Sequence, residues 1–224
     1  DMTFDYMGKY IWRGQNLTDE PVFQPGIGAT YGGLTAGAWG NMDTTSVNGE
    51  SGDFTEWDFY LDYSDDLPGM EGVSYSVGVI YDHFPSLVGD TTEIYGGLGF
   101  DMPLNPSITA YYDIDEIDGI YVSGSIGHSI EKIAELSPEI PIGMDISASL
   151  GWGDEDYTSG YWGIRESDFQ DLALQIAFPM ELGGWTISPN LNYITLVSED
   201  LRESDAFDTS SDYFFAGISL ARSF

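Results

Sequence analysis

Residues 8–33 read GKYIWRGQNLTDEPVFQPGIGATYGG, which is a strand-like segment, a polar loop, a returning strand and a tight turn at Gly32 and Gly33. The segment that enters this stretch alternates two kinds of side chain. Aromatic residues occupy one face and charged residues the other: Phe4, Tyr6, Tyr10 and Trp12 against Asp5, Lys9 and Arg13. A strand of this kind needs an apolar environment on one side and a hydrated space on the other.

The same alternation recurs to the end of the chain. It predicts about twelve strands, at residues 3–14, 22–31, 34–42, 54–64, 73–82, 91–101, 108–115, 120–130, 142–152, 169–178, 185–196 and 213–224. An even number of strands is typical of single-chain barrels in the bacterial outer membrane. The 224 residues therefore form one domain, an all-β, antiparallel, up-and-down transmembrane β-barrel.

The connections between these segments alternate in length. Short turns are expected at residues 32–33, 65–72, 102–107, 131–141 and 181–184, and longer acidic loops at 43–53, 153–168 and 197–212. Short periplasmic turns and longer extracellular loops are the asymmetry of outer-membrane barrels. A soluble β-sandwich that buries the same apolar faces is the alternative, but the opposite faces are too rich in Ser and Gly for a soluble exterior.

Composition excludes several classes of protein. A formal charge of −32 excludes nucleic acid as a partner, because binding phosphate needs clustered cations. The absence of Cys excludes disulfides and thiolate metal sites. No run of about 18 apolar residues predicts a membrane-spanning helix, whereas a spanning strand needs only about 9–11 residues. The first residue, Asp1, agrees with a mature protein exported to the bacterial outer membrane, although a trimmed chain would look the same.

A family resemblance rests on the opening segments. Lys9–Gly14 (KYIWRG), Gln15, Pro21, residues 24–26 (QPG) and residues 34–40 (LTAGAWG) resemble the start of the Gcw-chp proteins of bacteria, also called TorF-family porins. The likeness continues through residues 56–63 and 73–81 and covers about the first eighty residues. It implies a porin-type outer-membrane barrel and says more about architecture than about activity.

With the apolar faces turned to outer-membrane lipid, charged residues line the lumen. The expected constriction contains Lys9, Arg13, Glu56, Asp58, Glu93, Asp113 and Asp171. Two interpretations stay open. The residues form a narrow, acidic pore for cations or small polar solutes, or they form an ion-pair network that closes the lumen of a structural barrel.

The acidic loops give a second candidate site. Calcium is bound by several oxygen ligands, and five loop carboxylates could supply them: Asp154, Glu155, Asp156, Glu199 and Asp200. Calcium would then bridge neighbouring barrels into a homo-oligomer, lattice or filament, which is the role that goes with a closed lumen. No other cofactor is expected. The two histidines, His83 and His128, do not pair with a Ser and an Asp in the pattern, so we expect no enzyme.

Overall fold

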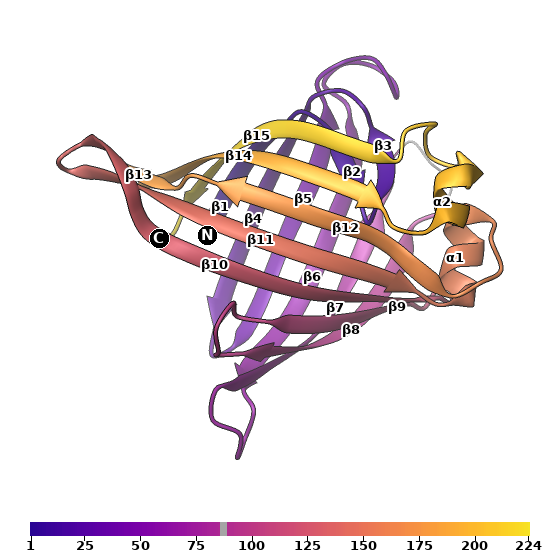
Figure 1. Cartoon of the computed structure of the whole chain (residues 1–224), viewed down its shortest axis with the longest axis horizontal. Coiled ribbons are helices and arrows are strands. Elements are labelled where there is room, and N and C mark those ends of the chain that lie inside the picture. Colours follow the sequence, from indigo (N-terminus) through magenta and orange to yellow (C-terminus); the bar gives the residue numbers. More distant parts are fainter. Residues whose placement is uncertain (86–88) are drawn as a thin grey trace.

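The computed structural model describes residues 1–85 and 89–224, which form a closed barrel of twelve antiparallel strands (Figure 1). Neighbours in the chain are neighbours in the barrel, and the pairings β1–β15 and β12–β14 complete the ring. The barrel strands are β1 (Met2–Met7), β4 (Val22–Tyr31), β5 (Leu34–Asp43), β6 (Phe54–Asp66), β7 (Val73–His83), β8 (Thr91–Phe100), β9 (Ser107–Asp113), β10 (Ile120–Ser137), β11 (Ile140–Gly153), β12 (Asp168–Ala177), β14 (Trp185–Leu196) and β15 (Asp212–Arg222).

The polarity of the wall is the reverse of that of a soluble protein. Apolar side chains such as Ile27, Val77, Leu98 and Phe214 are exposed on the outside. The buried side chains of the barrel strands are largely polar, among them Gln24, Asn41, Glu56, Glu93, Asp113, Asn190 and Asn192. An apolar exterior around a polar interior is the distribution of a transmembrane barrel, so the fold class predicted from the alternation is confirmed.

The two ends of the barrel differ. The turn end carries both chain termini and the short connections, of which residues 32–33 and 138–139 are the tightest. The loop end carries helix α1 (Glu155–Trp162), helix α2 (Glu199–Ser204) and a small hairpin of β2 (Tyr10–Trp12) and β3 (Gln15–Thr18) (Figure 1). Strand β13 (Met180–Leu182) pairs with the first residues of β14.

The strand predicted at residues 3–14 was wrong in its length, because the barrel strand in the structure is shorter. Strand β1 ends at Met7, and Gly8 donates a backbone hydrogen bond to Ala216 O at 2.9 Å as the chain leaves the wall. Residues 10–18 form the separate β2–β3 sheet. A Cβ on Gly8 would lie 3.1 Å from Ala216 O, so a residue without a side chain fits this departure.

Two connections also differ from the prediction. The turn predicted at residues 131–141 is confined to residues 138–139, because β10 continues to Ser137 and β11 begins at Ile140. The loops 153–168 and 197–212 contain the helices α1 and α2, which the strand pattern did not predict. Within the described residues, no helix is long and apolar enough to cross a membrane.

Candidate functional site: a hairpin across the lumen

The β2–β3 hairpin turns at Arg13 and Gly14. Trp12 pairs with Gln15, and both turn residues have positive φ, 48° at Arg13 and 82° at Gly14. Positive φ at both central residues defines the type of two-residue turn whose twist matches paired strands. Glycine adopts this conformation at no steric cost, whereas arginine is strained by it. Contacts that Arg13 makes elsewhere must therefore hold it there.

Arg13 pairs with a glutamate of the barrel wall. Its Nη1 and Nη2 donate to the two carboxylate oxygens of Glu93, on β8, at 2.6 and 2.7 Å. Both side chains are nearly buried, with 10% and 4% of their surface exposed. The guanidinium also lies over the rings of Trp12, Tyr111 and Tyr121, with centroid distances of 4.3, 4.5 and 4.4 Å. A two-pronged ion pair inside an aromatic cage fixes both the position and the orientation of the guanidinium.

These contacts cross the barrel. The hairpin leaves the wall after β1, while Glu93, Tyr111 and Tyr121 lie on β8, β9 and β10. In the closed strand order, β9 is as far from β1 as a twelve-strand ring allows. The hairpin therefore spans the lumen at the loop end.

Helix α1 contacts the hairpin at the loop end of the barrel. The Trp12 ring packs against Tyr161 with centroids 5.5 Å apart, and Gln15 Nε2 donates to Tyr157 Oη at 3.3 Å. Tyr157 is only 1% exposed, and burial raises the pKa of its phenol above the ordinary range. Burial raises the pKa of Tyr161 in the same way. Both phenols are therefore neutral hydrogen-bonding groups at any physiological pH.

The returning strand β3 is anchored to β5. Thr18 Oγ1 donates to Asp43 Oδ1 at 3.2 Å, and Asn48 Nδ2 donates to Thr18 Oγ1 at 3.0 Å. Asn16 Nδ2 donates to Asp208 Oδ2, in the loop that carries α2, at 3.0 Å. The hairpin is thus bonded to β8, to β5 and to the loop that carries α2, and it is an ordered part of the lumen.

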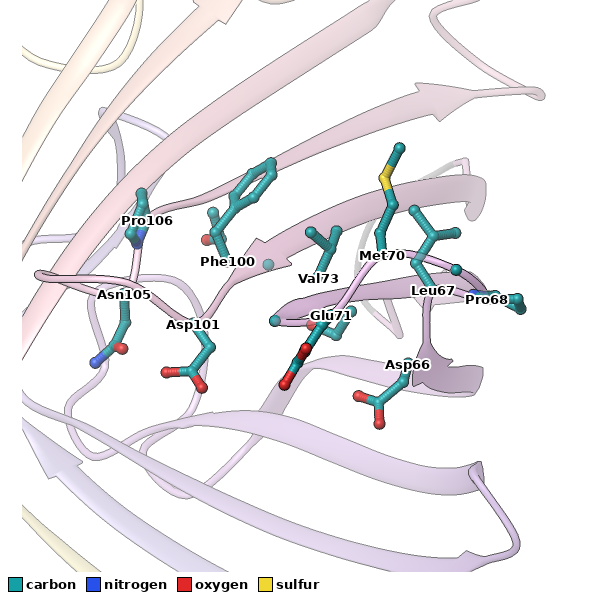
Figure 2. A pocket seen from close by; sticks show the side chains of 15 residues that line it. Asp66, Leu67, Pro68, Met70, Glu71, Val73, Phe100, Asp101, Asn105 and Pro106 are labelled. Carbon is teal, nitrogen blue, oxygen red and sulfur yellow. The ribbon is translucent and has the colours of Figure 1, made fainter.

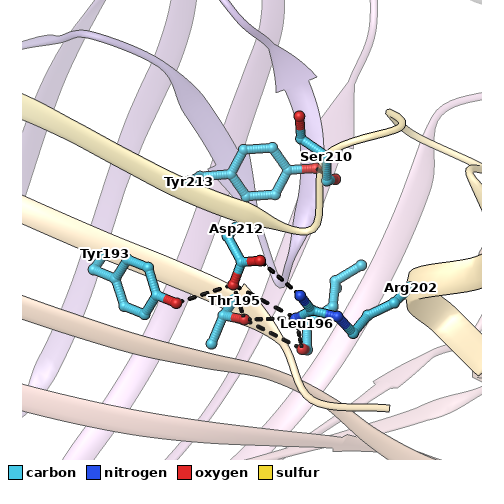
Figure 3. Close-up of polar contacts among 7 residues, drawn as sticks. All are labelled: Tyr193, Thr195, Leu196, Arg202, Ser210, Asp212 and Tyr213. Carbon is cyan, nitrogen blue, oxygen red and sulfur yellow. Dashed lines mark hydrogen bonds and ion pairs between the residues drawn. The ribbon is translucent and has the colours of Figure 1, made fainter. Parts of the chain in front are cut away.

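The loop that carries α2 is tied to the rim of the barrel (Figure 3). Arg202 pairs with Asp212 at 2.6 Å and donates to the carbonyl of Leu196 at 2.9 Å. Tyr193 and Thr195 donate to the same Asp212 carboxylate at 2.9 and 2.6 Å. A small apolar cluster lies beside this network, made of Trp162, Leu196 and Leu201 with Tyr161, Ile164 and Phe207 around them. Helices α1 and α2 therefore form a packed cap over part of the loop end.

A cavity of about 640 Å³ surrounds the hairpin tip. Seven carboxylates line it, from Glu56, Asp58, Asp82, Glu93, Asp113, Glu116 and Asp171. Arg13 is the one Lys or Arg in this lining, as far as the described residues extend. Of the predicted constriction residues, Arg13, Glu56, Asp58, Glu93, Asp113 and Asp171 are thus brought together.

Lys9 does not line this cavity. Its amino group pairs with Asp19 at the base of the hairpin, where the Asp19 side chain is 57% exposed. Trp12, which the alternation places on the apolar face of the first strand, lies instead in the lumen, where its ring contacts the Arg13 guanidinium and Tyr161. Asp82 was missed, although it continues the alternation of Ser74, Ser76, Gly78 and Ile80 by one step.

The five loop carboxylates lie at helix N-termini. Asp154 caps α1 by accepting from Tyr157 N at 2.8 Å, and Glu155 and Asp156 follow in the first turn. Glu199 and Asp200 occupy the first turn of α2, after the cap Ser198. Acidic residues at these positions stabilise a helix through its dipole. Across residues 1–85 and 89–224, no group of three or more His, Asp or Glu side chains is placed to hold a metal ion. Calcium binding at these loops stays a prediction.

Two further cavities continue toward the turn end. One of about 530 Å³ shares Ser149, Ala173 and Ile194 with the cavity at the hairpin, so the two adjoin along β11, β12 and β14. The cavity of about 530 Å³ also shares Asn105 with a third cavity, of about 910 Å³. This third cavity lies between the turns 67–72 and 101–106 (Figure 2). The three cavities follow one another from the loop end to the turn end.

Comparison with known proteins identifies a class of fold. No protein-family model and no curated protein matches the sequence, so the resemblance to the Gcw-chp family stays a prediction. Among solved structures, the chain is similar over its whole length to two porin barrels. The first, "NanC porin", has 11% sequence identity and a TM-score of 0.61, and the match covers all of both chains. The second, "KdgM porin", has 10% sequence identity and a TM-score of 0.57, and the match covers 99% of each chain.

A third similar structure is LpxR from Salmonella typhimurium, at 9% identity and a TM-score of 0.52, covering all of this chain and 99% of that one. At these identities the likeness extends to the fold alone. The protein is a twelve-stranded transmembrane barrel of the architecture found in these porins.

Proposed function

We propose that the protein is an outer-membrane channel for small cations and polar solutes, narrowed by the β2–β3 hairpin. The observation that carries this proposal is the lining of the cavity at the hairpin tip, where seven carboxylates surround one arginine. Because Glu93 already neutralises Arg13, the remaining charge is negative and attracts cations. The cavity that adjoins it along β11, β12 and β14 supports a route past the hairpin on this side of the lumen.

A non-enzymatic role agrees with the two histidines. His83 Nδ1 contacts Asp90 at 2.9 Å near the loop end, and His128 is exposed on β10. Neither lies in the lining of the cavity at the hairpin. The described residues of this cavity therefore contain no Ser-His-Asp arrangement.

Planar-bilayer recordings test the channel directly. We expect ion currents from the purified protein and a reversal potential, in a potassium chloride gradient, that favours potassium over chloride. The Arg13→Ala variant removes the guanidinium from the constriction and should raise both the conductance and the preference for cations. Arg165→Ala removes the same charge from an exposed loop position and should leave both unchanged. Anion preference, or no current after repeated insertions, would refute the channel.

One observation favours the competing function, a structural barrel with a closed lumen. The hairpin crosses the lumen and its Arg13–Glu93 pair is almost fully buried. In that case the acidic loops would pack neighbouring subunits, with or without calcium at Asp154, Glu155, Asp156, Glu199 and Asp200. A variant whose residues 9–20 are replaced by a short Gly-Ser linker separates the two functions. A silent wild type with a conducting variant would support closure, and calcium-dependent association in calorimetry and size-exclusion chromatography would support assembly.

A further inference from the structure

The carboxylates around the hairpin tip differ in the hydrogen bonds and ion pairs that they make with the protein. Glu93 is paired with Arg13. Asp113 accepts from Thr91 Oγ1 at 2.8 Å and from two backbone amides of the β9–β10 connection. Asp171 accepts from Tyr121 Oη at 2.8 Å. These three have partners within the protein, and a fourth, Glu116, is exposed in the β9–β10 connection, which leaves the acidic residues of β6 and β7.

Glu56, Asp58 and Asp82 form what we call the β6–β7 carboxylate patch. Glu56 and Asp58 share a face of β6, and Asp58 lies opposite Asp82 in the register of the two strands. All three line the same cavity. The patch is therefore one continuous negative surface on the wall.

The patch has few donors for its buried carboxylates. Asp82 is only 8% exposed, and its side-chain hydrogen bond within the described residues is with the carboxyl group of Asp58, another acid. Asp58 Oδ1 is buried without a hydrogen-bond partner. Glu56, 7% exposed, is hydrogen-bonded to the Tyr10 phenol. Carboxylates that are crowded together in a buried site repel one another when charged, and a cation in the cavity would stabilise their charged form.

The shape of the cavity indicates what kind of cation fits. The patch lacks the close three-ligand arrangement that a metal ion needs, as does the rest of the described chain. A volume of about 640 Å³ is in the range of sites for small organic ligands. Apolar and aromatic side chains complete the lining, among them Ile11, Trp12, Ile80, Phe84, Tyr111 and Phe207. Carboxylates beside ring faces suit an ammonium group attached to a hydrocarbon chain.

We propose that the β6–β7 carboxylate patch binds the ammonium group of a small organic amine, whose hydrocarbon part lies against the apolar lining. This inference names the solute class of the proposed channel and rests on that function. Binding and conduction are measured separately, so that either can fail alone.

The experiment uses the full-length protein in detergent and 1,4-diaminobutane as the probe, followed by calorimetry and by the fluorescence of Trp12 and its neighbours. We expect saturable binding of the diamine and none of 1,4-butanediol, its neutral counterpart of equal length. Asp82→Asn and Glu56→Gln should each weaken binding at least tenfold. Asp145→Asn should not, because Asp145 lies on β11 outside the lining of this cavity. The butanediol comparison needs no variant and stands even if a substitution impairs folding.

Each outcome decides the inference. Loss of diamine binding in Asp82→Asn with retention in Asp145→Asn supports it. Equal displacement of the diamine by magnesium or calcium at similar concentrations would show a general metal site and overturn it, as would equal binding of butanediol. No diamine binding with intact potassium currents overturns the amine site and leaves the channel. Diamine binding without any current supports the site and overturns the channel.

Discussion

Arg13, at the tip of a hairpin that leaves β1, makes a two-pronged ion pair with Glu93 on β8, on the far side of the barrel, at 2.6 and 2.7 Å. Because both side chains are nearly buried, the ion pair stabilises the position of the hairpin only while both residues are present and charged. The position of the hairpin in the lumen therefore depends on this contact.

Replacing Glu93 by Gln should loosen the hairpin. Breaking a buried ion pair from one side costs about 3–5 kcal/mol, because the other charge stays buried without a partner. We expect faster hydrogen exchange of the β2–β3 amides and larger current fluctuations. The double variant Arg13→Ala/Glu93→Gln should cost less than the sum of the two single variants. Asp19→Asn is the matched control, since its pair with Lys9 is exposed and is worth about 1 kcal/mol at most.

Gly14 allows the turn to approach the wall. It has a φ of 82°, and a Cβ there would lie 2.7 Å from Leu196 Cδ2 and 3.0 Å from Asp171 Cβ. Gly14→Ala should cost about 1–2 kcal/mol for the left-handed backbone and about 1–3 kcal/mol more for overpacking. Urea unfolding followed by tryptophan fluorescence measures the total.

Gly32→Ala separates these two contributions. Gly32 also has a positive φ, 57°, but no atom lies within 4 Å of the Cβ position. We expect it to show the backbone cost alone. Equal destabilisation by the two variants would contradict close packing of the turn against β12 and β14.

Much of this architecture could be predicted from the sequence, because a barrel wall imposes alternation on every strand. The same alternation gave the lumen-facing Glu56, Asp58, Glu93, Asp113 and Asp171. It failed at β1, since Lys9, Tyr10, Trp12 and Arg13 keep the period of two after the chain has left the wall. Periodicity reports that a segment is extended and does not report which sheet it joins.

The helices at the loop end left a different kind of signal. Asp154 and Ser198 are capping residues, and each is followed by two acidic residues in a first turn. This pattern predicts a helix start, a signal that the alternation of the strands does not contain. The pairing of Arg13 with Glu93 could not be predicted, because the two are eighty residues apart and meet only through barrel closure.

Lowering the pH should release the connection between β7 and β8 at Asp90. Hydrogen bonds from Tyr81, from His83 and from the amide of Phe84 lower the pKa of Asp90 from 3.8 to about 2. A depressed folded-state pKa stabilises the fold above the unfolded-state pKa, and this contribution is lost as the pH falls from about 4 through 2. The amide hydrogen of Phe84, which is donated to Asp90 Oδ1 at 3.1 Å, should therefore exchange faster, relative to its intrinsic rate, at pH 2 than at pH 4.

Asp90→Asn provides the comparison for this measurement. Without a titrating carboxylate, the variant should exchange the amide hydrogen of Phe84 faster than the wild type at pH 4 and at a similar rate at pH 2. Because intrinsic exchange itself depends on pH, the two proteins are compared at each pH. The same ratio of rates at both pH values would mean that Asp90 does not hold the connection through its charge.

Gly151, on β11, gives Tyr121 the space to lie under Arg13. A Cβ at residue 151 would overlap both Tyr121 Oη and Asp171 Oδ1, which are hydrogen-bonded to each other at 2.8 Å. Gly151→Ala should displace the Tyr121 ring, weaken its contact with the Arg13 guanidinium and change the conductance without changing any charge. Gly124→Ala, on the neighbouring strand β10, adds the same methyl group where nothing lies within 4 Å. If both variants conduct like the wild type while both fold, the aromatic cage does not set the position of Arg13 in the lumen, and the ion pair with Glu93 alone must do so.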